Sequence, residues 1–98
     1  MKLLPIFPAA AVVLFFTAAA ADSSEPPVGA AACSGCHPPS SAVETSVPVL
    51  AGRSVQDIVA QMRAFRFGQR GATVMDRIVK GYSDSEIEAI AGWYQAQR

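Results

Sequence analysis

The sequence predicts an all-α fold of three to five short helices, and three observations support this prediction. Residues 54–67 and residues 83–97 each have the pattern of a capped amphipathic helix. A shorter segment, residues 29–37, contains both cysteines and the single histidine of the 98-residue chain. At this length the chain has room for one domain.

The clearest helix is predicted at residues 54–67. Ser54 is a suitable N-cap, Asp57 stands three residues later in a capping-box position, and Gly68 ends the helix. Apolar side chains recur at helical spacing along one face and predict a buried stripe. The stripe consists of Val55, Ile58, Val59, Met62 and Phe65.

A second capped helix is predicted at residues 83–97. Ser83 and Glu86 form a Ser-x-x-Glu capping box. The apolar face consists of Ile87, Ile90, Ala91 and Tyr94, with Trp93 beside it. Both aromatic residues are interpreted as core side chains in preference to an electron relay.

Residues 29–37 predict a third, short helix. Three alanines at 30–32 favour it, and Pro38 with Pro39 end it. It contains Cys33-Ser34-Gly35-Cys36-His37, the Cys-x-x-Cys-His pattern of covalent haem c attachment. A three-residue step on a helix places both thiols on one face, so that each can add to a porphyrin vinyl group. The adjacent imidazole then reaches the iron, and one haem c is expected.

The two cysteines have three other interpretations: a redox pair, a zinc site and a structural disulfide. A thioredoxin-type redox pair needs a βαβ context that this sequence lacks. A zinc site needs four ligands, whereas only Cys33, Cys36 and His37 cluster here. A structural disulfide between cysteines three residues apart closes almost no loop and adds little stability. Haem attachment is therefore preferred.

The amino terminus predicts export. Lys2 precedes an apolar run that ends in small residues, so residues 1–21 are expected to form a signal peptide cleaved after Ala21. An uncleaved membrane anchor is the alternative, but Pro5 and Pro8 interrupt the run. We expect a periplasmic protein with no membrane span after cleavage, a flexible arm at residues 22–28 and one domain at residues 29–98.

Without the leader the chain has 77 residues, which is small for a self-sufficient hydrophobic core. The haem is expected to complete the interior, and the apoprotein is expected to fold poorly.

The chain without its leader has seven Arg and Lys residues and eight Asp and Glu residues, so its net charge gives no support for nucleic-acid binding. Basic residues crowd the region around Met75. A basic docking rim and an ordinary solvated helix face both explain them. These residues are Arg63, Arg66, Arg70, Arg77 and Lys80.

The segment Pro48-Val49-Leu50-Ala51-Gly52 resembles the Pro-x-Leu-x-Gly stretch of class I c-type cytochromes. The resemblance implies that the Pro48 carbonyl accepts a hydrogen bond from the axial histidine, His37, which would strengthen the imidazole as an iron ligand. The alternative is a turn proline in front of a buried leucine. The resemblance also implies a small class I cytochrome c fold in which Ala91 and Gly92 let the last helix approach the attachment helix closely.

A second resemblance extends from Met62 toward the carboxy terminus and is most specific at Thr73-Val74-Met75-Asp76-Arg77-Ile78-Val79-Lys80-Gly81-Tyr82-Ser83. This run is similar to the haem subunit of flavocytochrome c sulfide dehydrogenase, and together with the haem motif the similarity covers nearly all of residues 30–97. Departures are Asp76, where the family tends to have glycine, and the two prolines after His37.

This resemblance implies an electron-transfer protein that is not itself an enzyme. Its partner would be a flavoprotein that oxidises sulfide and passes electrons to the haem. A free diffusible carrier serving an oxidase or another dehydrogenase is the alternative, and a haem sensor or small oxidase is a third class.

Met75 is the expected sixth iron ligand opposite His37, since it follows a glycine-containing turn and its separation from His37 suits a small class I cytochrome. Met62 lies in an apolar stripe, where methionine is usually core filler. If neither methionine bound iron, the site would be open to small ligands.

Overall fold

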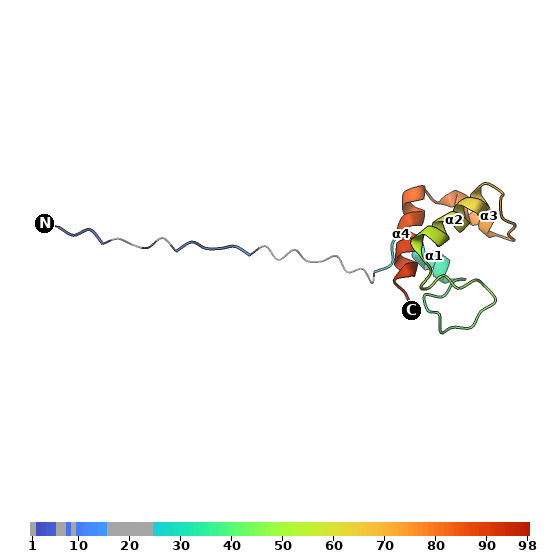
Figure 1. Ribbon diagram of the computed structural model, residues 1–98, viewed down its shortest axis with the longest axis horizontal. Helices are drawn as coiled ribbons and strands as arrows, with labels where there is room; N and C mark the ends of the chain where they lie inside the picture. The colour runs from blue at the N-terminus through green and yellow to red at the C-terminus, as the bar shows by residue number, and fades with distance from the viewer. Residues whose placement is uncertain (1, 6–7, 9, 16–24) are drawn as a thin grey trace.

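A computed structural model of the chain describes residues 2–5, 8, 10–15 and 25–98. Within these residues the chain forms helices and no strand, so the all-α prediction is confirmed (Figure 1). The elements are α1 (Ala30–Ser34), α2 (Val55–Arg66), α3 (Met75–Ile78), a 3₁₀ turn (Val79–Gly81) and α4 (Asp84–Gln95).

Helix α2 confirms the predicted boundaries, with one difference at its cap. The Ser54 hydroxyl accepts a hydrogen bond from the Asp57 backbone N–H at 3.1 Å. The carboxylate of Asp57 does not return to Ser54 but pairs with Arg53 at 3.2 Å, so the capping box is half formed. At the other end Gly68 has φ +69, which is the left-handed conformation that suits glycine after a helix.

Helix α4 confirms both the predicted capping box and the predicted buried face. The Ser83 N–H donates to Glu86 Oε1 at 2.9 Å, and the Glu86 N–H donates to Ser83 Oγ at 3.2 Å. The buried side chains of α4 are those expected, with Trp93 added to them. They are Ile87, Ile90, Ala91, Trp93 and Tyr94.

Helix α1 is shorter than the predicted segment 29–37. It ends at Ser34, because the next backbone N–H groups bond three residues back: Gly35 to the Ala32 carbonyl and Cys36 to the Cys33 carbonyl. The His37 N–H still reaches the Cys33 carbonyl at 2.8 Å. Cys36 and His37 therefore lie in a tight turn after the helix, and the expectation that both thiols sit on one helical face was wrong in this detail.

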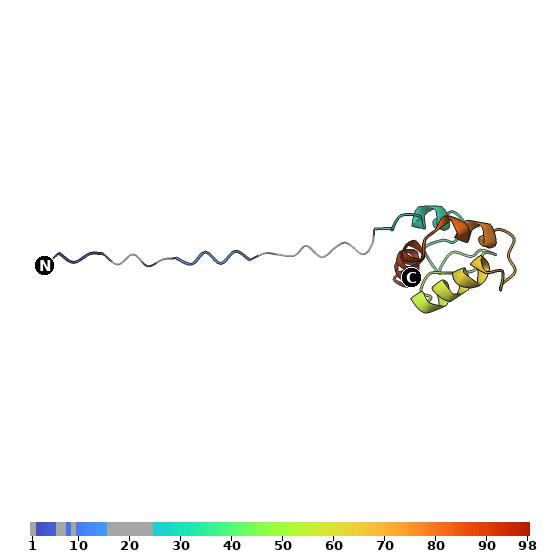
Figure 2. The same cartoon turned by 90° about the horizontal axis from the view of Figure 1, so that it is seen from above.

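The core lies where α2 packs against α4, with the first residue of α1 joining it. Figure 2 shows α4 nearly end-on, with α1 and α2 on opposite sides of the helical part of the molecule. The fully or almost fully buried cluster comprises Ala30, Ile58, Ile90, Ala91, Trp93 and Tyr94. The rings of Trp93 and Tyr94 meet edge to face, with centroids 5.0 Å apart. Both are core aromatics, as predicted.

A close approach between α4 and α1 was expected at Ala91 and Gly92. Ala91 is fully buried in one cluster with Ala30, whereas Gly92 makes no close contact and the tightest glycine contact is at Gly29. A Cβ added to Gly92 would meet no atom of another element within 4 Å, whereas a Cβ at Gly29 would lie 2.5 Å from Tyr82 Cε1. Gly29 also has φ +92, a conformation that side-chain-bearing residues rarely adopt. The absent side chain lets the start of α1 lie against Tyr82 and Ile90.

The described residues before position 16 form no helix or strand. The predicted cleavage point after Ala21 and the first residues of the predicted arm, 22–24, lie outside the described residues. Within the described part of the chain, every helix is too short or too polar to cross a bilayer.

Candidate haem-binding site

One cavity brings together all five residues that the sequence singled out. Its volume is about 540 Å³, within the range of roughly 300–1,000 Å³ that is typical of small-molecule sites. Cys33, Cys36, His37, Pro48 and Met75 all line it. Cys33 lies in α1, and Cys36 and His37 lie in the turn after it. Pro48 lies in the loop before α2 and Met75 begins α3, so three separate segments of the chain converge here.

The deep end of this cavity is apolar. A smaller hollow of about 30 Å³ shares Cys33, His37 and Met75 with the main cavity and has a purely apolar lining surface. Its other walls come from α2, α4 and the segments before them. These residues are Leu50, Ile58, Met62, Tyr82, Ile87 and Ile90. The buried faces of α2 and α4 thus form walls of this hollow as well as the core.

His37 is the one buried polar residue among those described, with 8% of its surface exposed. Its Nδ1 lies 2.7 Å from the carbonyl oxygen of Pro48. Because a carbonyl oxygen can only accept a hydrogen bond, Nδ1 must carry the proton in the neutral ring. The lone pair is then on Nε2, which is the atom left to bind a metal.

The backbone of His37 is held by a residue for which the sequence indicated only a packing role. The Tyr94 hydroxyl donates to the His37 carbonyl oxygen at 2.7 Å, and Ser34 Oγ lies 3.3 Å from the same hydroxyl. Burial raises the pKa of Tyr94, so the hydroxyl keeps its proton at neutral pH. The amphipathic pattern predicted a buried tyrosine, but a contact across 57 residues leaves no local signal.

We expect Tyr94→Phe to destabilise the folded protein by about 1–3 kcal/mol, because the substitution leaves the buried His37 carbonyl without its donor. Urea unfolding of the ferric protein would measure this. Tyr82→Phe is the matched control, since the Tyr82 hydroxyl makes no hydrogen bond within residues 25–98, and we expect it to change stability little. Equal losses in the two variants would contradict the role given to Tyr94.

The two cysteines differ in their surroundings. Cys33 is half-buried at the inner end of α1, and burial raises the pKa of its thiol, which therefore stays protonated at neutral pH. Cys36 is exposed at the mouth of the cavity. Both side chains are free thiols that line the same cavity as the imidazole.

Met75 is the first residue of α3, a helix too short for the sequence to reveal. Its N-cap, Val74, makes no side-chain hydrogen bond, and four residues are too few to show a period. Helix α3 packs against α2, which brings Met75 to the same cavity as Met62. Both methionines therefore face the site, and the choice of Met75 as the iron ligand remains a prediction.

The residues of the predicted basic rim have separate environments. Arg66 joins α2 to the start of α4, with contacts of 2.5 Å to Asp84 Oδ1 and 2.9 Å to the Tyr82 carbonyl. The hydrogen bond from Arg66 lowers the pKa of the exposed Asp84 carboxyl. Arg70 lines the cavity, whereas Arg63, Arg77 and Lys80 are exposed and do not line it.

The residues present fit a haem. The cavity has mostly apolar walls, an imidazole whose Nδ1 is held by a carbonyl oxygen, two thioether side chains and two thiols at Cys-x-x-Cys spacing. This donor set matches the His and Met ligation and the thiol attachment of c-type cytochromes. The helical fold and the donor set of the site are therefore similar to those of the c-type cytochrome class.

Comparison with known proteins agrees with this class. The chain is 35% identical over 63 residues to the cytochrome subunit of sulfide dehydrogenase from Chlorobaculum tepidum, a match that covers 64% of this chain and 57% of that protein. It is 38% identical to a thiosulfate dehydrogenase electron acceptor from Stutzerimonas stutzeri, over 63% of this chain and 31% of that protein. No family model matches the chain. The predicted resemblance to a sulfide dehydrogenase cytochrome subunit is confirmed.

The chain spans little more than half the length of the first relative and about a third of the second. One relative is named a cytochrome subunit and the other an electron acceptor. Both names describe proteins that carry electrons for a dehydrogenase acting on a sulfur compound.

Proposed function

We propose that this chain is an exported, monohaem c-type cytochrome that accepts electrons from a sulfide-oxidising flavoprotein and passes them on. The observation that carries the proposal is the convergence of Cys33, Cys36, His37 and Met75 on one apolar cavity. The similarity to a sulfide dehydrogenase cytochrome subunit supports the choice of donor. The apolar run before Ala21 supports periplasmic export.

Each residue has a defined task in this proposal. A haem c supplies one-electron chemistry through its ferric and ferrous states. Cys33 and Cys36 would attach the haem covalently, and His37 and Met75 would bind its iron. The Pro48 carbonyl holds the His37 ring through Nδ1, which makes Nε2 a stronger donor. The apolar walls exclude water, which favours the less charged ferrous state.

A second candidate is a freely diffusing carrier, and the similarity to a protein named as an electron acceptor favours it. The two candidates differ in how long the partner stays bound. A permanent subunit remains attached at any ionic strength. A diffusing carrier docks through screened charges and separates in salt, because the Debye length falls to about 3 Å at 1 M.

The test is purification of the untagged chain from the periplasm of its native cell, with gel filtration at low salt and again in roughly 1 M salt. We expect the haem absorbance to elute with flavin absorbance in both runs, and sulfide to reduce the haem in that fraction. Elution with flavin only at low salt would favour the diffusing carrier. A chain without covalent haem in the periplasm would contradict the proposed function altogether.

A further inference from the structure

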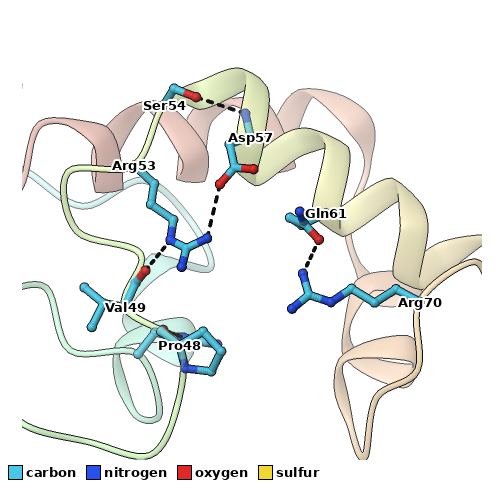
Figure 3. Close-up of polar contacts among 8 residues, drawn as sticks. Pro48, Val49, Arg53, Ser54, Asp57, Gln61 and Arg70 are labelled. Carbon is cyan, nitrogen blue, oxygen red and sulfur yellow. Dashed lines mark hydrogen bonds and ion pairs between the residues drawn. The ribbon is translucent and has the colours of Figure 1, made fainter.

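The cavity has an uneven distribution of charge. Among the described residues that line it, the side chains with formal charge are Arg53, Asp57 and Arg70. The rest of the lining is neutral and mostly apolar. Figure 3 shows the guanidinium groups of Arg53 and Arg70 extending toward one another on the side of the site next to α2. The charge at this rim therefore depends on how each arginine is paired.

Arg53 is already compensated. Its Nη1 lies 3.2 Å from Asp57 Oδ2, and its Nε donates to the Val49 carbonyl at 2.6 Å (Figure 3). The Arg53–Asp57 pair therefore adds no net charge to the rim. The bond to Val49 holds the loop residue next to Pro48, so Arg53 has a structural task there.

Arg70 is held in place without being neutralised. Its Nη1 donates to Gln61 Oε1 (Figure 3). Its guanidinium carbon lies 4.9 Å from the centre of the Phe65 ring. Both partners are neutral, and both line the same cavity. Gln61 and Phe65 thus fix the guanidinium group while its full positive charge remains available. Among the described residues Arg70 forms no ion pair, and an oriented cation of this kind at the edge of an apolar cavity is complementary to an anion.

We propose that Arg70, positioned by Gln61 and Phe65, binds a carboxylate of the porphyrin at the rim of the cavity. A haem carries two carboxylates on one edge, and the planar guanidinium group can donate two parallel hydrogen bonds to one of them. The inference rests on the proposed haem function and deepens it. The positive charge of Arg70 then balances a negative charge near the iron. This favours the ferrous state, so Arg70 raises the reduction potential.

The test is the midpoint potential of the purified holoprotein at fixed pH and ionic strength. We expect Arg70→Gln to lower it by an amount equivalent to a roughly three- to tenfold change in the ferric-to-ferrous ratio, up to about 59 mV for one electron. Arg70→Lys keeps the positive charge but loses the planar guanidinium group, so its midpoint potential should lie between those of the wild type and Arg70→Gln. Arg77→Gln is the matched control, because this exposed arginine lies close to Met75 in sequence yet outside the cavity lining.

A second measurement observes the carboxylate itself. Redox-difference infrared spectra of protein carrying haem with carbon-13 in its carboxylates should show a shifted carboxylate band in Arg70→Gln and an unshifted one in Arg77→Gln. The inference would be overturned if Arg70→Gln and Arg77→Gln had equal potentials and equal carboxylate bands in protein with a normal c-type spectrum. The proposed haem function would then remain intact. A wild-type protein without haem would overturn both.

Discussion

Replacing both Cys33 and Cys36 by alanine should yield a chain with no covalently bound haem and no cooperative unfolding transition. The 540 Å³ cavity lies against the core, and an empty cavity costs about 24 cal/mol per Å³, which gives a penalty on the order of 10 kcal/mol. Water at the open mouth reduces this figure, but the free energy of unfolding of a small domain is itself only about 5–15 kcal/mol. Haem staining after denaturing electrophoresis and a thermal melt would measure both effects.

Ser34→Ala is the control for this experiment, because it changes a residue between the two cysteines and leaves both thiols in place. It removes only the hydroxyl contacts to the Ala30 carbonyl and to Tyr94. We expect it to retain haem and to melt cooperatively. A double cysteine variant that is colourless but melts cooperatively would show that the fold does not depend on the cofactor.

Replacing Met75 by alanine should remove the methionine-to-iron charge-transfer band of the ferric protein. It should also lower the reduction potential by on the order of a few tenths of a volt, because axial ligands set haem potentials over a range of roughly 0.8 V. The thioether sulfur favours the ferrous state, and its loss leaves the iron with a vacant or water-occupied position. Carbon monoxide binding to the reduced protein should appear in the same variant.

Met62→Ala is the matched control, since Met62 lines the same cavity from α2. We expect it to keep the charge-transfer band and to lose about 2–5 kcal/mol of stability, as large-to-small changes in apolar surroundings do. The opposite pattern, with the band lost in Met62→Ala and kept in Met75→Ala, would make Met62 the ligand. Loss in neither variant would exclude methionine ligation.

Local sequence patterns were sufficient to predict the two long helices. Ser54 and Ser83 mark the starts of α2 and α4, and the apolar stripes identify the faces that are buried. Helix α1 was predicted too long because its alanines favour a helix. The chain tightens after Ser34 through backbone hydrogen bonds to the third residue back, and the helix propensities of single residues do not predict these bonds. Helix α3 was not predicted because its cap has no side-chain hydrogen bond and its length is one turn.

The residues of the site also divide into those with a local sequence signal and those without one. The Cys-x-x-Cys-His spacing is local, so the sequence alone indicated the residues that are proposed to attach the haem. Pro48 was proposed only through resemblance, and its carbonyl does lie beside His37 Nδ1. The contact of Tyr94 with His37 and the place of Arg70 at the rim depend on tertiary packing. Arg70 was noted in the sequence as one of several basic residues, with nothing to distinguish it from Arg77.

The two sides of the site are anchored with unequal strength. His37 is fixed through its ring by Pro48 and through its backbone by Tyr94, whereas Met75 belongs to a single helical turn whose cap is unsupported by any side chain. We therefore expect partial opening to begin at Met75 while His37 keeps its position. With the proposed haem bound, such a protein would exchange the Met75 ligand reversibly under stress, without losing its cofactor or refolding from the start.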